Sequence, residues 1–173
     1  MPVTRLNHAV MYVSDVRRSV AFYQDIMGFE PINMLPAGFN SAAFLRASGS
    51  TNDHDLGLFE IGSSAQASQA GRGQVGLYHL AWEVDTLGEL QRTAERLSKA
   101  GALVGSSDHG STKSLYAKDP DGLEFEVVWL IPADRLEEAD LAKRSSIGAL
   151  DLNAEVERFG ADTRGGVGIS VAV

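Results

Sequence analysis

Four histidines are the side chains of this sequence with the widest chemical use, because imidazole both binds metals and exchanges protons near neutral pH. They are His8, His54, His79 and His109. His8 and His79 occupy corresponding positions beside two similar apolar segments. Two imidazoles and one carboxylate form a facial set that holds Fe(II) and leaves positions open, and the same set binds Mn(II) or Zn(II). The histidine spacing therefore directs attention to the carboxylates.

Glu126 is the carboxylate best placed to join such a set. Residues 114–117 and 124–129 predict two strands, joined by a turn at Asp119-Pro-Asp-Gly122. Glu126 lies in the middle of the second strand, where a carboxylate is largely buried and needs a metal or a charged partner. Taken alone, a strand with one polar face toward water is the simpler interpretation. The rest of the chain favours the metal.

The elements that must position these residues form an internal repeat. In each half of the chain the hydrophobic periodicity predicts a strand, a helix and three further strands. Ser14 and Thr86 are expected to cap the two helices, which end at Gly28 and Gly101. The predicted strands cover residues 6–13, 29–34, 41–46 and 55–61 in the first half, and 77–84, 103–106, 114–117 and 123–129 in the second. This order predicts an α+β fold of two βαβββ modules.

The module boundaries follow from composition. We expect an N-terminal module at residues 1–62, a linker rich in Ser, Ala, Gln and Gly at residues 63–76, and a C-terminal module at residues 77–131. Residues 132–173 form an extension of different character. Pro132 can begin a helix that runs to about residue 145, residues 151–159 predict a second one, and the final apolar segment is either an edge strand or unstructured.

Composition excludes several classes of function. The chain of 173 residues has no cysteine, so any metal must be held by His, Asp or Glu. Its net charge of −8 argues against nucleic acid or an anionic membrane as a partner. The sequence contains neither a long apolar run nor the pattern of a signal peptide, so we expect a cytoplasmic protein. Small molecules remain as the expected ligands.

Five segments resemble the vicinal oxygen chelate superfamily, the glyoxalase, bleomycin resistance and dioxygenase proteins, and within it the type I extradiol dioxygenases. They are LNHAVMYV, SVAFYQDIMGF, NDHDLGLFEIG, GLYHLAWEV and DHGSTKSLYAKDPDGLEFEVVW, within residues 6–131. The resemblance implies two βαβββ modules that form a half-barrel around one metal site. Most members of the dioxygenase family are roughly twice as long, so this chain resembles a one-domain form.

Carried over residue by residue, the resemblance implies that His8, His79 and Glu126 are the metal ligands, with Fe(II) as the cofactor and Mn(II) as a possible substitute. His54 corresponds to the histidine that faces bound dioxygen. His109 and Tyr116 correspond to residues that contact the substrate hydroxylates. The implied reaction is the cleavage of a catechol-type aromatic diol by O2 to a muconic semialdehyde, in a homo-oligomer of two or more chains.

Two alternatives stay open. In the glyoxalase and epimerase branches of the superfamily, the position of Glu60 supplies a fourth ligand, and the enzyme is a lyase or isomerase. A binding protein of the same fold that sequesters a small molecule is the third hypothesis. Such proteins usually lack a complete metal triad, so the histidines of this chain count against it.

Overall fold

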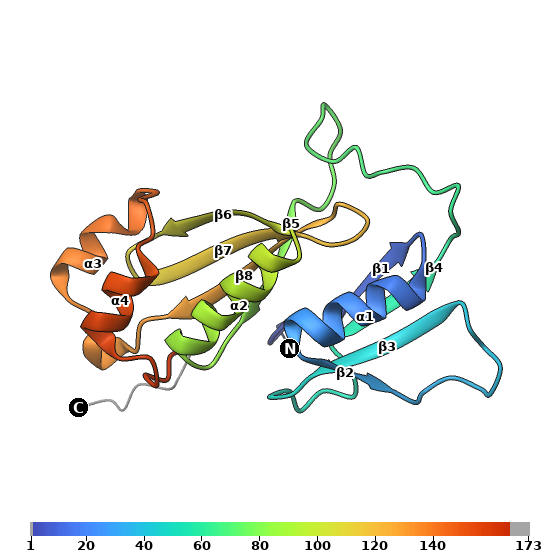
Figure 1. Ribbon diagram of the computed structural model, residues 1–173, viewed down its shortest axis with the longest axis horizontal. Helices are drawn as coiled ribbons and strands as arrows, with labels where there is room; N and C mark the ends of the chain where they lie inside the picture. The colour runs from blue at the N-terminus through green and yellow to red at the C-terminus, as the bar shows by residue number, and fades with distance from the viewer. Residues whose placement is uncertain (1, 167–173) are drawn as a thin grey trace. The chain divides into compact units, whose positions relative to one another are not determined.

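The structure, a computed structural model, describes residues 2–166 and divides into two compact units. Unit 1 contains residues 1–68 and 119–122, and unit 2 contains residues 69–118 and 123–173. Each unit has one four-stranded mixed sheet, and neither sheet closes into a barrel (Figure 1). No helix within residues 2–166 is both long enough and apolar enough to cross a membrane. The predicted α+β class and the repeated βαβββ order are confirmed.

Unit 1 carries the first repeat. Its elements are β1 (Ala9–Val13), α1 (Val16–Met27), β2 (Phe29–Ile32), β3 (Ala42–Ala47) and β4 (Leu56–Glu60). The strand order is β1-β4-β3-β2, in which only β1 and β4 are parallel. Helix α1 covers one face of this sheet with a continuous apolar core, because alternate residues of each strand point toward it. The fully buried core residues include Val13, Tyr23, Leu45, Leu56 and Leu58.

The N-terminus of α1 corrects one sequence-based prediction. The N-cap is Asp15, whose carboxylate accepts a hydrogen bond from the Arg18 amide at 3.0 Å. Ser14, the expected cap, instead donates its hydroxyl to the carboxylate of Asp121 at 2.5 Å. Asp121 belongs to the predicted turn Asp119–Gly122, and the Gly122 amide closes that turn on the Asp119 carbonyl at 2.9 Å. A long-range carboxylate therefore takes Ser14 away from the helix.

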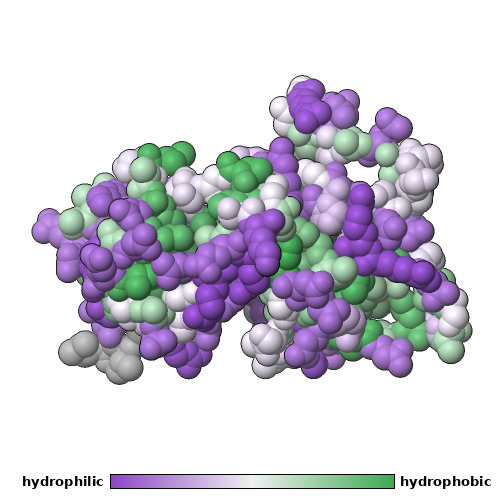
Figure 2. Space-filling view, viewed as in Figure 1, coloured by the Kyte–Doolittle hydropathy of each residue, from purple (hydrophilic) through white to green (hydrophobic). Residues whose placement is uncertain are grey.

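Unit 2 repeats the design. Its elements are β5 (His79–Glu83), α2 (Leu87–Lys99), β6 (Leu103–Asp108), β7 (Thr112–Lys118) and β8 (Glu124–Leu130), with the strand order β5-β8-β7-β6. Thr86 caps α2 as predicted, through a hydrogen bond from the Glu89 amide at 3.2 Å. The core consists of residues with almost no exposed surface: Leu87, Leu90, Leu97, Leu115, Phe125, Val127 and Trp129. The opposite face of α2 is hydrophilic (Figure 2) and exposes Arg92, Glu95 and Lys99.

The C-terminal extension is not the long helix that its sequence predicts. It forms a turn of 3₁₀ helix (Ala133–Arg135), the short helix α3 (Glu138–Ala142), a second 3₁₀ turn (Lys143–Ser145) and α4 (Leu152–Phe159). Leu136 is extended, and the Asp140 carboxylate folds back onto the Glu137 amide at 3.1 Å, so a new helix starts there. The second predicted helix is confirmed, with Asp151 as its cap. The final apolar segment lies largely outside the described residues.

Candidate metal centre

His79 and Glu126 meet on the face of unit 2 opposite α2. His79 is the first residue of β5, and its neighbour in register on β8 is Glu124, two residues before Glu126. The Nε2 atom of His79 lies 3.2 Å from Oε2 of Glu126, and the two side chains are 25% and 13% exposed. The Nδ1 atom of His79 is buried, and no described residue hydrogen-bonds to it. The pair is thus largely shielded from water, and Nδ1 of His79 makes no hydrogen bond to the described residues.

This separation suits two ligands of one metal ion. Two donor atoms that each bind a metal at about 2.1 Å and subtend a right angle lie about 3.0 Å apart. A neutral imidazole and a carboxylate are ligands that both Fe(II) and Mn(II) accept. His79 and Glu126 therefore fit as two ligands of a divalent metal such as Fe(II) or Mn(II). Among residues 2–166, no three His, Asp or Glu side chains converge within one cluster, and the expected third ligand, His8, belongs to unit 1.

Tyr116 and His109 extend the same face of unit 2. Tyr116 is directly opposite Glu126 in the β7–β8 register. Its hydroxyl lies 2.9 Å from Nε2 of His109, in the loop between β6 and β7. Burial raises the pKa of the Tyr116 phenol, and the negative charge of Glu126 and a hydrogen bond to it raise it further. Tyr116 therefore keeps its proton and serves as a hydrogen-bond donor.

Unit 1 brings His8 and His54 together. Their ring centroids are 4.4 Å apart, and the ring of Phe44 packs edge-on against His54 at 4.8 Å. His8 precedes β1 and is exposed, whereas Nδ1 of His54 is buried and has no hydrogen-bond partner among the described residues. The predicted site residues therefore form two groups. Unit 1 has His8 and His54, and unit 2 has His79, Glu126, Tyr116 and His109.

The loop that carries His54 is held by its neighbour Asp55. The Asp55 carboxylate accepts hydrogen bonds from the Ala47 amide at 2.8 Å, the Ser50 hydroxyl at 2.7 Å and the Asn52 side chain at 2.7 Å. Burial alone would raise the pKa of Asp55, but these hydrogen bonds outweigh it and hold the pKa below its usual value. The ionised carboxylate fixes the loop from within unit 1.

The strand register shows which residue of unit 1 stands where Glu126 stands in unit 2. Leu80 pairs with Phe125 and Ala81 with Glu126 in unit 2, just as Ala9 pairs with Leu56 and Val10 with Gly57 in unit 1. The next strand agrees, because Tyr116 faces Glu126 whereas Phe44 faces Gly57. The carboxylate and phenol of unit 2 are thus replaced by a glycine and a phenyl ring.

Glu60 does not occupy that position, which counts against the alternative in which it is a fourth ligand. It lies three residues after Gly57 and shares a face of β4 with the buried Leu56 and Leu58, beneath α1. Its Oε2 accepts a hydrogen bond from the Val16 amide at 3.0 Å, at the first turn of that helix. The carboxylate therefore serves a helix N-terminus, and its face is not that of Gly57 and Phe44.

One buried residue close to the site, Lys113, was not predicted as buried. Lys113, which begins the segment KSLYAK, has no exposed side-chain surface and lies 2.5 Å from the carboxylate of Asp108. A lysine in a short strand ordinarily faces water. The only available signal was its place in the alternation, because Lys113 falls on the same face as Leu115 and Ala117.

Two βαβββ units that present imidazole and carboxylate donors on a sheet face are the architecture of the vicinal oxygen chelate proteins. Residues 5–127 match the Glyoxalase/Bleomycin resistance protein/Dioxygenase superfamily, and the chain belongs to this family. A solved glyoxylase/bleomycin resistance protein/dioxygenase domain from Frankia sp. EAN1pec has the same fold. It has a TM-score of 0.59 and 19% identity over 76% of this chain and 96% of that one.

The curated relatives have more than one activity. The catechol-2,3-dioxygenase of Bacillus subtilis is 30% identical over 72% of this chain, but this chain spans only 41% of that protein. The lactoylglutathione lyase of Neisseria meningitidis serogroup A is 28% identical over 72% of this chain and 89% of its own length. These similarities support a metal-dependent enzyme of the superfamily without separating the dioxygenase from the lyase.

Proposed function

We propose that this protein is a non-heme extradiol dioxygenase that uses Fe(II), or Mn(II) in its place, to cleave a catechol-type aromatic diol with O2. The observation that carries the proposal is the register pair Gly57 and Phe44. A fourth ligand, a carboxylate, would complete a closed set of metal ligands. At the position in unit 1 that corresponds to Glu126, Gly57 and the facing Phe44 offer no side-chain donor atom. Two histidines and one carboxylate remain, which is the ligand set that leaves positions for a chelating diol and dioxygen.

His79, Glu126 and His8 would hold the metal, which when bound supplies a template for the diol and a path for electrons toward dioxygen. Tyr116 keeps its proton because burial and Glu126 raise its pKa, so its hydroxyl donates a hydrogen bond to a substrate oxygen and orients it. His109, whose Nε2 lies 2.9 Å from that hydroxyl, is proposed as the second residue that contacts the substrate hydroxylates.

His54 is proposed as the acid that protonates oxygen during ring opening. Its ring is partly shielded by His8 and Phe44, and its Nδ1 is not engaged by any described residue. An imidazole so placed has a nitrogen available for proton transfer rather than for holding the fold. Ring opening followed by hydrolysis gives a muconic semialdehyde.

One observation favours a second candidate, a lyase. This chain aligns with 89% of the length of a lactoylglutathione lyase, so a protein of about this size is sufficient for that activity. The structure does not supply Glu60 for it, because that carboxylate is bound to the first turn of α1. A lyase would therefore need another fourth donor, and the dioxygenase requires none.

The test is anaerobic reconstitution with Fe(II), and in parallel with Mn(II), followed by oxygen uptake with catechol, 3-methylcatechol and 2,3-dihydroxybiphenyl. Metal content is measured in the same samples, and a His79→Ala variant serves as the metal-free control. We expect stoichiometric oxygen uptake and a yellow product from the wild type alone. Full metal loading without oxygen uptake from any diol would reject the proposal, and lactoylglutathione formation by that sample would establish the lyase.

A further inference from the structure

The C-terminal extension is built into unit 2 although it lies beyond residues 5–127, the part that matches the family. The ring of Phe159 on α4 packs against Trp129 of β8, with centroids 5.4 Å apart. The Arg135 guanidinium donates to the Phe159 carbonyl at 2.8 Å and to the Thr163 hydroxyl at 2.9 Å. Figure 1 shows α3 and α4 together at one end of the unit, beside the ends of β6 and β7. The extension is therefore a fixed part of the unit.

Its contacts converge on the loop that carries His109. Asp108, one residue before the histidine, exchanges two backbone hydrogen bonds of 2.9 Å with Gly148 of the extension. Gly110, one residue after it, has a φ of 75° and lies so close to the Asp140 carbonyl of α3 that no Cβ would fit there. Both neighbours of His109 are thus held by residues of the extension.

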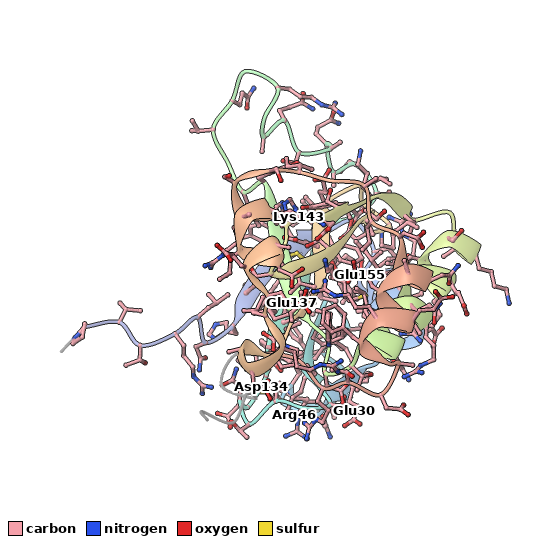
Figure 3. The ribbon with its side chains drawn as sticks, turned by 90° about the vertical axis from the view of Figure 1, so that its left-hand side faces the viewer. Glu30, Arg46, Asp134, Glu137, Lys143 and Glu155 are labelled. Atoms are coloured by element: carbon pink, nitrogen blue, oxygen red, sulfur yellow. The ribbon has the colours of Figure 1, made fainter. Side chains whose placement is uncertain are left out.

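A buried ion cluster strengthens this attachment. The Lys113 ammonium has no exposed surface and lies 2.5 Å from Asp108 and 3.3 Å from Glu155 of α4, which Figure 3 labels. Asp108 also accepts a hydrogen bond from the Gly110 amide at 2.9 Å, so one carboxylate binds both β7 and the loop. Burial alone would raise the pKa of Asp108, but Lys113, Gly110 and Lys143 outweigh it and lower the pKa.

A second ion pair joins the two helices of the extension. Arg158 of α4 donates two hydrogen bonds to the carboxylate of Asp140 on α3, at 2.8 Å and 2.7 Å. Such a bidentate pair fixes direction as well as distance. The position of α3 against Gly110 therefore depends on α4, and α4 is held by Lys113 and the core.

His109 itself is half-buried, and its Nε2 lies 2.9 Å from the Tyr116 hydroxyl. Its backbone amide donates to the Thr112 carbonyl at 3.0 Å. This hydrogen bond closes the loop but does not fix the direction of the loop relative to β7 and β8. That direction is set at the two neighbouring residues. A shift of about 1 Å at a catalytic group can lower a rate by about a hundredfold.

We propose that the C-terminal extension positions His109. The central positioning residue is Lys113 of β7, which is held between Asp108 of β6 and Glu155 of the extension. The geometric claim concerns the His109–Tyr116 contact of the free protein. Only its catalytic consequence rests on the proposed dioxygenase function.

The geometric claim is tested by nuclear magnetic resonance on metal-free protein. Lys113→Met removes the charge, and Lys118→Met makes the same change at an exposed lysine of the same strand. Long-range ¹H–¹⁵N spectra of the four imidazoles are assigned with His109→Gln. We expect the His109 nitrogens to shift in Lys113→Met, and the His54 nitrogens to stay in place. An unchanged His109 signal in a folded Lys113→Met protein would overturn the proposal.

Lys113→Met leaves two carboxylates near one another without their cation, so Glu155→Gln is the milder companion variant. It keeps the shape of the side chain and weakens only the attachment of α4 to Lys113. We expect a smaller shift of His109 in the same direction, with the circular dichroism spectrum unchanged. A folded Glu155→Gln protein whose His109 signal matches the wild type would also count against the proposal.

The catalytic consequence is tested by kinetics on the Fe(II)-loaded protein. We expect Lys113→Met to lower kcat about tenfold with KM within about twofold, and to have little further effect in a Tyr116→Phe background, because both changes break the same contact. Fully additive losses would overturn the assigned route through His109. If no diol is cleaved even by the wild type, the proposed function fails, and the magnetic resonance result still decides the positioning claim.

Discussion

The two units have one architecture and two chemistries. Both fold as βαβββ, with the parallel strand pair at one side of the sheet and matching registers. At the equivalent cross-strand position unit 2 has Tyr116 opposite Glu126, and unit 1 has Phe44 opposite Gly57. A repeated fold therefore supplies repeated positions, and the side chain at each position decides whether it offers a donor atom for a metal or only packs against a ring.

The units also differ in how they hold their second histidine. The loop of His54 is fixed locally, by three hydrogen bonds to the carboxylate of Asp55. The loop of His109 is fixed by distant residues, from Gly148 and Asp140 of the extension. We therefore expect the loop of His54 to keep its arrangement when the C-terminus is altered, and the loop of His109 to lose it.

The largest expected effect is on metal binding, and it should distinguish Glu126 from Glu60. Glu126→Ala removes the carboxylate beside His79, so we expect stoichiometric Fe(II) binding to be lost, with affinity lowered by more than about a hundredfold. Glu60→Ala should leave metal binding intact, because its carboxylate serves the α1 N-terminus. Metal analysis after gel filtration checks both. Loss of iron from Glu60→Ala would remove the distinction between the units.

Tyr116→Phe makes the register pair of unit 2 resemble that of unit 1. We expect iron to remain bound and kcat for ring cleavage to fall about a hundredfold, because the donor hydroxyl is lost while the ring is kept. Phe44→Tyr is the matched change in unit 1, and it should alter kcat little. Oxygen uptake of the two variants measures the contrast, and equal losses from both would contradict it.

His54→Phe tests the histidine of unit 1 that is proposed as an acid and not as a metal ligand. We expect full iron content and a fall in ring cleavage of about tenfold to a hundredfold, since an aromatic ring remains but the proton-transferring nitrogens are gone. Oxygen uptake and iron content are measured on the same sample. Turnover equal to the wild type would show that His54 is misassigned.

Acid stability should reveal the ion pairs of the extension. A hydrogen bond from Arg158 is the main reason that the pKa of Asp140 lies below its usual value of 3.8. The pair therefore stabilises the fold fully above this unfolded pKa, and its stabilisation is lost as the pH falls through the lower folded pKa. Asp140→Asn should cost about 2 kcal/mol at pH 7 and less at pH 3, which lies below the unfolded pKa, so that part of the contribution is already lost. Urea unfolding at both pH values gives the difference, and a constant cost would contradict the pairing.

The smallest expected effect is at Gly57. A Cβ at this position would lie 3.3 Å from side-chain atoms of both Phe44 and Val10, which is tight but not blocked by backbone. We expect Gly57→Ala to lower the free energy of unfolding by about 1 kcal/mol and to leave metal content unchanged. Thermal unfolding and metal analysis check this, and a stabilised protein would show that the glycine is not needed for packing.

Most of the fold could be predicted from the sequence, because periodicity and caps are local signals. Thr86, Gly28 and the turn Asp119–Gly122 act as predicted. The failures have long-range causes. Ser14 is bound by Asp121, more than a hundred residues away, and Asp140 folds back onto Glu137 and pairs with Arg158, which divides a helix that periodicity alone would continue. Homo-oligomerisation stays a prediction.

The sequence by itself determined the chemical inventory of this protein, namely four histidines, no thiol and a carboxylate within an apolar strand that follows a tight turn. Tertiary structure decided which of these side chains share a face. A shift of one residue in register moves a side chain to the other face of a sheet. For that reason Gly57, which has no side-chain donor atom, stands at the position that corresponds to Glu126, whereas Glu60, three residues later, lies on the other face and binds the first turn of α1. Lys113 is likewise buried although its residue type predicts exposure.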